Sequence, residues 1–341
     1  MEYLLALRMK RKKERVYKHR TTYLSLTEKD CLKSLHLPRH VVTEVCHLLS
    51  KELGSKTTFP LAVRVTSALR FFATGSMSSA DGIAKRSMIS FVASVSQELV
   101  RHADKFIVFP KTPASQALVK KVFKDKFGAP DVLGIIDCTH VVLRAPMENS
   151  NMYFNNEGSY SINVQIVCDA SSKITHVFTH FPASIPDSSI LEKSEIPSIF
   201  ESDPPLDGRL LGDTAYPLKT WLVTPFSKPK TKPELSFNIM HLDAFEAMDR
   251  TVAMLKKRFR CLDKSSGPLQ YSPHKVGLFF AACCVLHNIA LRHGCSVKLD
   301  AEAVIRIRRI DKAMHMPLTE PKTDAVAMMG RAQLAQQLCE K

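Results

Sequence analysis

The stretch 132-VLGIIDCTHVVLRAP-146 decides the fold, because helical spacing of apolar residues gives way there to that of strands. Valine, isoleucine and leucine dominate it and a proline ends it, which is typical of a buried β-strand. Two similar stretches follow, 161-SINVQIVCDASS-172 and 174-ITHVFTHFPAS-184, each bounded by turn-forming residues. Three consecutive strands joined by turns predict an antiparallel meander.

The segments around this meander predict an α/β fold. Downstream we expect a helix around 186–193, a short strand over 209–211 that ends at Gly212 and Asp213, and helices over 243–261 and 273–293. This order describes a mixed sheet flanked by helices. Upstream, helical spacing over 40–53, 60–72 and 89–106 predicts an all-helical region. We divide the chain into a basic arm (1–25), a helical region (26–125), an α/β domain (126–300) and a C-terminal helical tail (301–341).

The charge balance points to an anionic partner. The chain has 48 Lys and Arg against 33 Asp and Glu, a formal net charge of +15, and its densest basic run is 8-RMKRKKERVYKHR-20. Such an excess favours nucleic acid or an anionic membrane surface.

The longest apolar stretch, 276–291, is interrupted by His287 and Asn288 and is shorter than the roughly 20 residues of a spanning helix. We therefore expect a buried helix there and no membrane association. The cysteines lie in apolar contexts, which predicts reduced thiols and an intracellular protein.

Aspartates at the edges of apolar stretches are the candidate active-site residues. They are Asp137, Asp187, Asp213 and Asp249. Isolated carboxylates in such surroundings are costly, so a shared cation is expected. In the predicted sheet Asp137 closes the first strand, Asp213 closes the fourth, and the helix with Asp249 crosses the same edge. The alternative stays open that each aspartate only caps a turn or helix.

Two basic segments are candidates for DNA binding. In 78-SSADGIAKRSMISFVASVSQELVRH-102, a short helix from Ser79, a turn at 85–87 and a helix from Met88 would have helix-turn-helix spacing. This places Lys85, Arg86 and Ser87 first at the DNA, although helical hairpins of this length also occur in proteins that bind nothing. The helix after Asp249 could hold a phosphate backbone or simply present a solvated face; its basic residues are Lys256, Lys257, Arg258 and Arg260.

These residues bring the chain close to a known family: it resembles the Harbinger transposase-derived nucleases, which descend from the PIF/Harbinger DNA transposases. The resemblance is nearly full length, and its last two motifs are the most specific. The motifs are 136-IDCTHVVLRAP-146, 161-SINVQIVCDA-170, 210-LLGDTAYPLKTWLVTP-225, 258-RFRCLD-263, 269-LQYSPHKV-276 and 281-AACCVLHNIALRHG-294.

The resemblance implies an RNase H-like catalytic core of the Asp-Asp-Glu type, preceded by a helical DNA-binding region. The family's first two catalytic carboxylates map onto Asp137 and Asp213, and an additional aspartate maps onto Asp187. The family's glutamate falls on Asp249, which is one methylene shorter. The expected activity is hydrolysis of DNA phosphodiester bonds with Mg²⁺ or Mn²⁺, both of which prefer hard oxygen ligands.

The same resemblance leaves an alternative and implies partners. Because Asp249 is shorter, the alternative is a catalytically weakened or inactive DNA-binding or scaffold protein that retains the transposase fold. Members of this family typically work with a separate Myb-like DNA-binding protein that helps bring them to the nucleus. We therefore expect DNA and such a protein as partners, a location in nucleus and cytoplasm, and a homo-oligomer as an open possibility.

Overall fold

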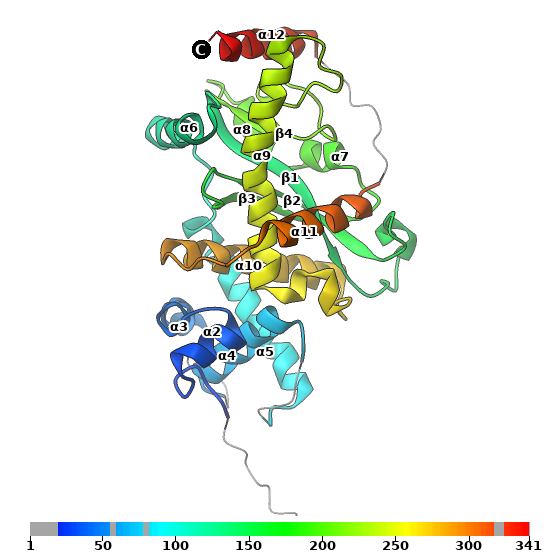
Figure 1. The fold of residues 1–341 in the computed structure, drawn as a ribbon. Helices are drawn as coiled ribbons and strands as arrows, with labels where there is room; N and C mark the ends of the chain where they lie inside the picture. The colour runs from blue at the N-terminus through cyan, green and yellow to red at the C-terminus, as the bar shows by residue number, and fades with distance from the viewer. Residues whose placement is uncertain (1–19, 55–58, 78–81, 317–323, 341) are drawn as a thin grey trace, which may run out of the picture.

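The structure is a computed structural model that describes residues 20–54, 59–77, 82–316 and 324–340. Most of the predicted basic arm lies outside these ranges. Figure 1 shows a mixed sheet with helices around it, and a group of N-terminal helices gathered at one end of the molecule. The helices before the sheet are α2 (Glu28–Leu35), α3 (Arg39–Leu53), α4 (Leu61–Thr74), α5 (Lys85–Arg101) and α6 (Pro113–Phe127), with a short 3-10 turn at Ala103–Lys105.

The sheet confirms the predicted meander and the predicted short strand over 209–211, and it adds one further strand, Leu222–Val223. Its strands are β1 (Val132–Val142), β2 (Ser161–Cys168), β3 (Ile174–Pro182), β4 (Arg209–Gly212) and β5 (Leu222–Val223), in the order β3-β2-β1-β4-β5. β1 pairs with β2, and β2 with β3, in antiparallel register, whereas β4 runs parallel to β1 and β5 parallel to β4. The predicted mixed α/β architecture, with its N-terminal helical region, is confirmed.

The helices after β3 cover the sheet. α7 (Asp187–Lys193) and α8 (Ile196–Phe200) pack near β2 and β4, and α9 (Lys232–Arg258) runs across β1 and β2. α10 (Pro273–Arg292) packs against β3 and α5, which ties the helical region to the sheet. α9 begins earlier than expected because Thr231 and Glu234 form a capping box at its start.

The predicted helix-turn-helix segment forms differently. α5 begins at Lys85, so Lys85, Arg86 and Ser87 are the first turn of a helix and not the turn between two helices. Residues 82–84 are not helical, and the short helix predicted from Ser79 begins outside the described residues. The helix that precedes α5 in the described chain is α4, which ends at Gly75 with a left-handed φ of 74°. Lys85 and Arg86 are exposed.

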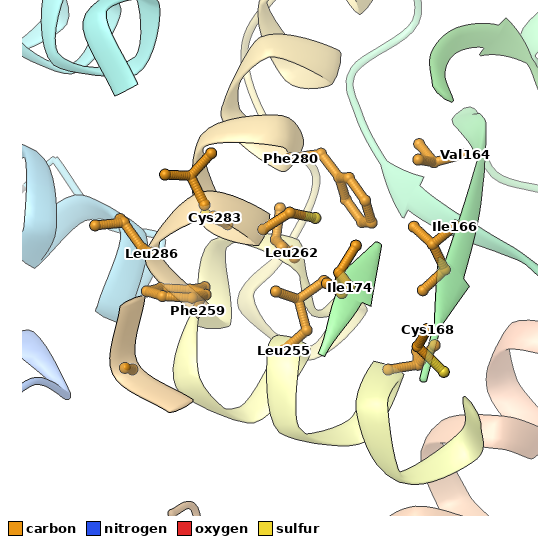
Figure 2. Packing of buried hydrophobic residues seen from close by; sticks show 14 of the residues in the cluster. Val164, Ile166, Cys168, Ile174, Leu255, Phe259, Leu262, Phe280, Cys283 and Leu286 are labelled. Carbon is orange, nitrogen blue, oxygen red and sulfur yellow. The ribbon is translucent and has the colours of Figure 1, made fainter. Parts of the chain in front are cut away.

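The main hydrophobic core lies between the sheet, α9 and α10. Figure 2 shows Ile166 of β2 and Ile174 of β3 facing Leu255 of α9 and Phe280 of α10, with Phe259 just after α9. All five side chains are fully buried. α10 is also long and apolar enough by composition to cross a membrane, but most of it is buried in this core, as expected. All nine cysteines are free thiols.

Two C-terminal helices pack back onto α9. α11 (Ala301–Met314) lies across α9 and β1, and α12 (Ala325–Cys339) packs near the other end of α9. Both belong to the tail that the sequence marked only as helical. The position of α11 matters most, because it crosses the region where the aspartates gather.

Candidate active site

The candidate aspartates line one cavity of about 300 Å³. Asp137 comes from β1, Asp187 from the first residue of α7, Asp213 from the residue after β4, and Asp249 from the middle of α9. Segments up to 112 residues apart in sequence are thereby brought to one place. The convergence expected from the sequence is present.

Strand register brings Asp137 and Asp213 together. β4 lies parallel to β1 with Gly212 opposite Ile136, so Asp213, the next residue, leaves the sheet beside Asp137. The prediction that Asp137 closes its strand is wrong, because β1 continues to Val142 and Asp137 still pairs with Ile166 of β2. The carboxylate thus stands on the face of a central strand.

Asp137, Asp187 and Asp213 form an electrostatically coupled group. Burial raises the pKa of Asp137 well above its ordinary value, and the neighbouring carboxylates of Asp213 and Asp187 raise it further. Burial also raises the pKa of Asp187, although the amide of Asn163 donates to its Oδ1 at 2.9 Å. Mutual repulsion of buried carboxylates favours a cation among them.

Asp249 stands apart from this group. Its Oδ2 lies 2.7 Å from Nη1 of Arg308. Burial raises the pKa of Asp249 to about 6, and the positive charges of Arg308 and Lys312 offset part of this rise. Asp249 is therefore already paired with a side chain of α11.

α11 brings basic side chains to three of the aspartates. Arg308 pairs with Asp249, Lys312 Nζ lies 3.5 Å from Asp213 Oδ2, and His315, just after the helix, has Nε2 3.5 Å from Asp187 Oδ2. Arg308 and Lys312 follow the i, i+4 spacing of one helix face, and His315 is the residue that follows the helix. Sequence reasoning missed them, because 301-AEAVIRIRRIDKAM-314 carries basic residues at other positions as well and the pattern alone does not select three.

A buried ion pair holds α11 in place. Lys256 Nζ lies 2.9 Å from Asp311 Oδ1, and the backbone N–H of His140 donates to the same oxygen at 2.8 Å. Although burial raises the pKa of Asp311, Lys256, His315 and His140 lower it below its ordinary value. Asp311 therefore remains ionised in the interior.

This pairing corrects part of the predicted DNA-binding face. Lys256 and Arg258 are buried, so they do not lie on an exposed face of α9. Arg258 instead donates to the carbonyl oxygen of Cys295. Lys257 and Arg260 are exposed, as a phosphate contact would require. Lys256 is buried where it pairs with Asp311 of α11, and Arg258 is buried where it lies against His287 of α10.

The donor chemistry suits a hard divalent cation. The cavity supplies carboxylate oxygens, and the buried Oδ1 of Asn163, which also lines it, has no hydrogen-bond partner in the described structure. Mg²⁺ and Mn²⁺ prefer such oxygens. Among the described residues, however, no three His, Cys, Asp or Glu side chains are arranged to hold a metal ion. The oxygen donors of the cavity are of the type that a divalent cation prefers. Two of the aspartates, Asp249 and Asp213, are already paired with basic side chains of α11.

Comparison with known proteins identifies the family. Residues 136–288 match the family described as DDE superfamily endonuclease. The chain is 38% identical over 280 residues to the human protein named "Putative nuclease HARBI1", with 80% of each chain covered. It is 35% identical to the Xenopus laevis protein of the same name, with 82% of each covered.

A more distant relative and the solved structures complete the comparison. The Arabidopsis thaliana "Protein ALP1-like" is 28% identical over 59% of this chain and 51% of its own length. No solved structure matches the chain significantly. The extent of the animal matches, together with the aspartates in one cavity, leads to one conclusion: the chain belongs to the Harbinger transposase-derived nucleases, which have an RNase H-like domain of the DDE type.

Proposed function

We propose that this protein is a divalent-metal-dependent endonuclease that hydrolyses DNA phosphodiester bonds. The observation that carries the proposal is the convergence of Asp137, Asp187, Asp213 and Asp249 in one cavity. DDE endonucleases generally use divalent metals, and Mg²⁺ or Mn²⁺ is the ion that the carboxylate set favours. The excess of positive charge on the chain favours a polyanionic substrate.

The aspartates have separate roles in this proposal. Asp137 and Asp213 would be the principal ligands, and Asp187 an auxiliary ligand whose carboxylate the Asn163 amide orients. Asp249 would be the remaining ligand, in the position of the family glutamate. When bound, a divalent ion would activate water and stabilise charge on the leaving oxygen. Val252 and Ile307 give the cavity an apolar side that limits access of bulk water.

A plasmid cleavage assay tests this function. The full chain is incubated with supercoiled DNA and Mg²⁺ or Mn²⁺, together with Asp137→Asn and Asp249→Glu variants. We expect nicked product from the wild type, none from Asp137→Asn, and more from Asp249→Glu, because the longer side chain reaches further into the cavity. Asp243→Asn, which removes an exposed carboxylate from the same helix, is the matched control. Absence of wild-type cleavage with either ion, at levels where Asp249→Glu does cleave, rejects the proposal.

A second candidate is a non-catalytic DNA-binding or scaffold protein that retains the fold. The pairing of Asp249 with Arg308 favours it, since a ligand held by a guanidinium is less available to a metal. This candidate predicts DNA binding that needs no metal and is unchanged in Asp137→Asn and Asp213→Asn. Loss of binding on adding EDTA to the wild type would exclude it.

DNA contacts and partners extend the proposal. Lys85, Arg86 and Ser87 at the start of α5, and the exposed Lys257 and Arg260 after Asp249, are the proposed phosphate contacts. The Myb-like partner, the nuclear and cytoplasmic location and a homo-oligomeric state follow only from family membership. Co-precipitation with a Myb-like protein, imaging of the tagged full chain and sedimentation analysis test them in turn.

A further inference from the structure

The basic side chains of α11 stand where a divalent cation would be needed. Arg308 and Lys312 pair with Asp249 and Asp213, and His315, just after the helix, has Nε2 3.5 Å from Asp187 Oδ2. Lys312 also lowers the pKa of Asp137, so its charge acts on two of the carboxylates. The ordinary role of a metal ion at such a site, neutralising repelling carboxylates, is thus partly filled by the chain itself.

The helix is anchored independently of these three contacts. The Asp311 carboxylate lies on the inner side of α11, where it meets Lys256 and the backbone of β1, and both side chains are less than a tenth exposed. Arg308 and Lys312, by contrast, are 35% and 44% exposed. Their side chains can move to solvent while the helix stays in place, because the anchor does not depend on them.

We propose that Arg308 and Lys312 are built-in competitors of the divalent metal, so that metal occupies the aspartate cavity only by displacing them. This inference rests on the proposed function, because it presupposes that Asp137 and its neighbours bind a divalent ion. It deepens that function by assigning control of metal binding to the C-terminal helix.

The physical reason is competition for the same oxygens. An ammonium or guanidinium and a hard dication both bind a carboxylate through its negative charge. Oδ2 of Asp249 must lose its pair with Arg308 before that oxygen ligates directly. At the other carboxylate oxygen the nearby guanidinium still repels a dication, so metal binding is weaker there too. Removing the positive charges while keeping the polar side chains should therefore strengthen metal binding and leave the fold unchanged.

Mn²⁺ binding to the full chain, followed by the electron paramagnetic resonance signal of the free ion, tests the proposal. The test variant is Arg308→Gln/Lys312→Gln, and the matched control Arg306→Gln/Arg309→Gln removes the same charge from exposed positions of the same helix. Arg308→Lys/Lys312→Arg retains both charges. Lys312→Gln alone is the gentler variant should the double variant fold poorly.

We expect the test variant to bind Mn²⁺ about tenfold more tightly than the wild type, because two nearby positive charges are removed. The Mn²⁺ affinity of the control and of the charge-retaining variant should stay within about twofold of the wild-type value. The control removes only exposed charges, and the charge-retaining variant keeps both charges at the site. Unchanged or weaker binding in both the test variant and Lys312→Gln overturns the inference.

Asp137→Asn in each background separates this inference from the proposed function. If it abolishes Mn²⁺ binding and Arg308→Gln/Lys312→Gln changes nothing, the metal site stands and the competition is rejected. If Asp137→Asn leaves Mn²⁺ binding intact, the ion does not occupy the cavity, and both proposals are overturned.

Discussion

Lys256 on α9 and Asp311 on α11 form a buried ion pair, with Nζ 2.9 Å from Oδ1 and both side chains less than a tenth exposed. Lys256 Nζ also donates to the carbonyl oxygen of His140 at 3.1 Å. The pair therefore joins α9, α11 and β1 beside the aspartate cavity, although its members are 55 residues apart.

Removing one member of this pair should destabilise the protein strongly. Asp311→Ala leaves the Lys256 ammonium buried without a counter-charge, which should lower the free energy of unfolding by about 3–5 kcal/mol. Lys256→Met/Asp311→Leu removes both charges and should cost less than the sum of Lys256→Met and Asp311→Leu. Urea titration followed by circular dichroism measures both. A loss below about 1 kcal/mol in Asp311→Ala would show that the pair does not anchor α11.

The buried imidazole of His287 should make stability depend on pH. Its Nε2 lies 2.9 Å from the carbonyl oxygen of Ser172, and burial lowers its pKa from 6.5 to about 4. The unfolded chain therefore binds a proton between these values that the folded chain does not, so stability falls as pH decreases from about 6.5 to 4. Above pH 6.5 the imidazole is neutral in both the folded and the unfolded chain, so it no longer makes stability depend on pH.

Substitution of His287 tests this linkage. His287→Gln should flatten the decrease in melting temperature between pH 6.5 and 4, even if it lowers stability overall. His47→Gln, which removes an exposed imidazole from α3, controls for the loss of a histidine. Equal slopes for His287→Gln and the wild type would assign the acid sensitivity to other groups.

Gly134 permits the close approach of β1 to its neighbours. A Cβ there would lie 2.7 Å from Val167 Cγ1 and 3.2 Å from the carbonyl oxygen of Cys168. Gly134→Ala should therefore lower the free energy of unfolding by about 1–3 kcal/mol through overpacking. Gly330→Ala in α12 meets no atom within 4 Å and should be neutral or stabilising. Chemical denaturation compares the two, and equal effects would exclude steric crowding at β1.

Lys85 and Arg86 should contribute phosphate contacts if α5 faces DNA. Lys85→Gln/Arg86→Gln should weaken DNA binding and lower the slope of log K against log salt by about 0.9 for each lost contact. Lys29→Gln/Lys33→Gln on α2 removes the same charge from exposed positions of the same helical region. Fluorescence anisotropy across a salt series distinguishes them, and identical slopes would assign the effect to net charge alone.

Local pattern was sufficient to predict much of the fold. The meander from β1 to β3, the short strand ending at Gly212 and the apolar helix α10 have sequence periods that specify strand or helix and turn residues that delimit them. The convergence of Asp137 with Asp213 was also predicted, but from the expectation that each aspartate closes a strand. In the structure it arises from the parallel register of β1 and β4.

The helix-turn-helix prediction and the exposed basic face of α9 show where local pattern is insufficient. The spacing around Lys85 suits a turn as well as a helix start, and only packing of α5 on α4 and α10 decides between them. Likewise Lys256 and Arg258 look like surface residues in sequence, because a buried charge is recognisable only when its partner is known.

The sequence by itself determined the fold class, because strand period and helix period are properties of neighbouring residues. Its resemblance to a known family singled out the candidate aspartates. Only the tertiary structure decided that α11 lies over those aspartates and pairs Lys312 with Asp213, 99 residues away. The physical reason is that an ion pair requires no particular sequence spacing. Its energy depends on the distance and burial that the folded chain imposes.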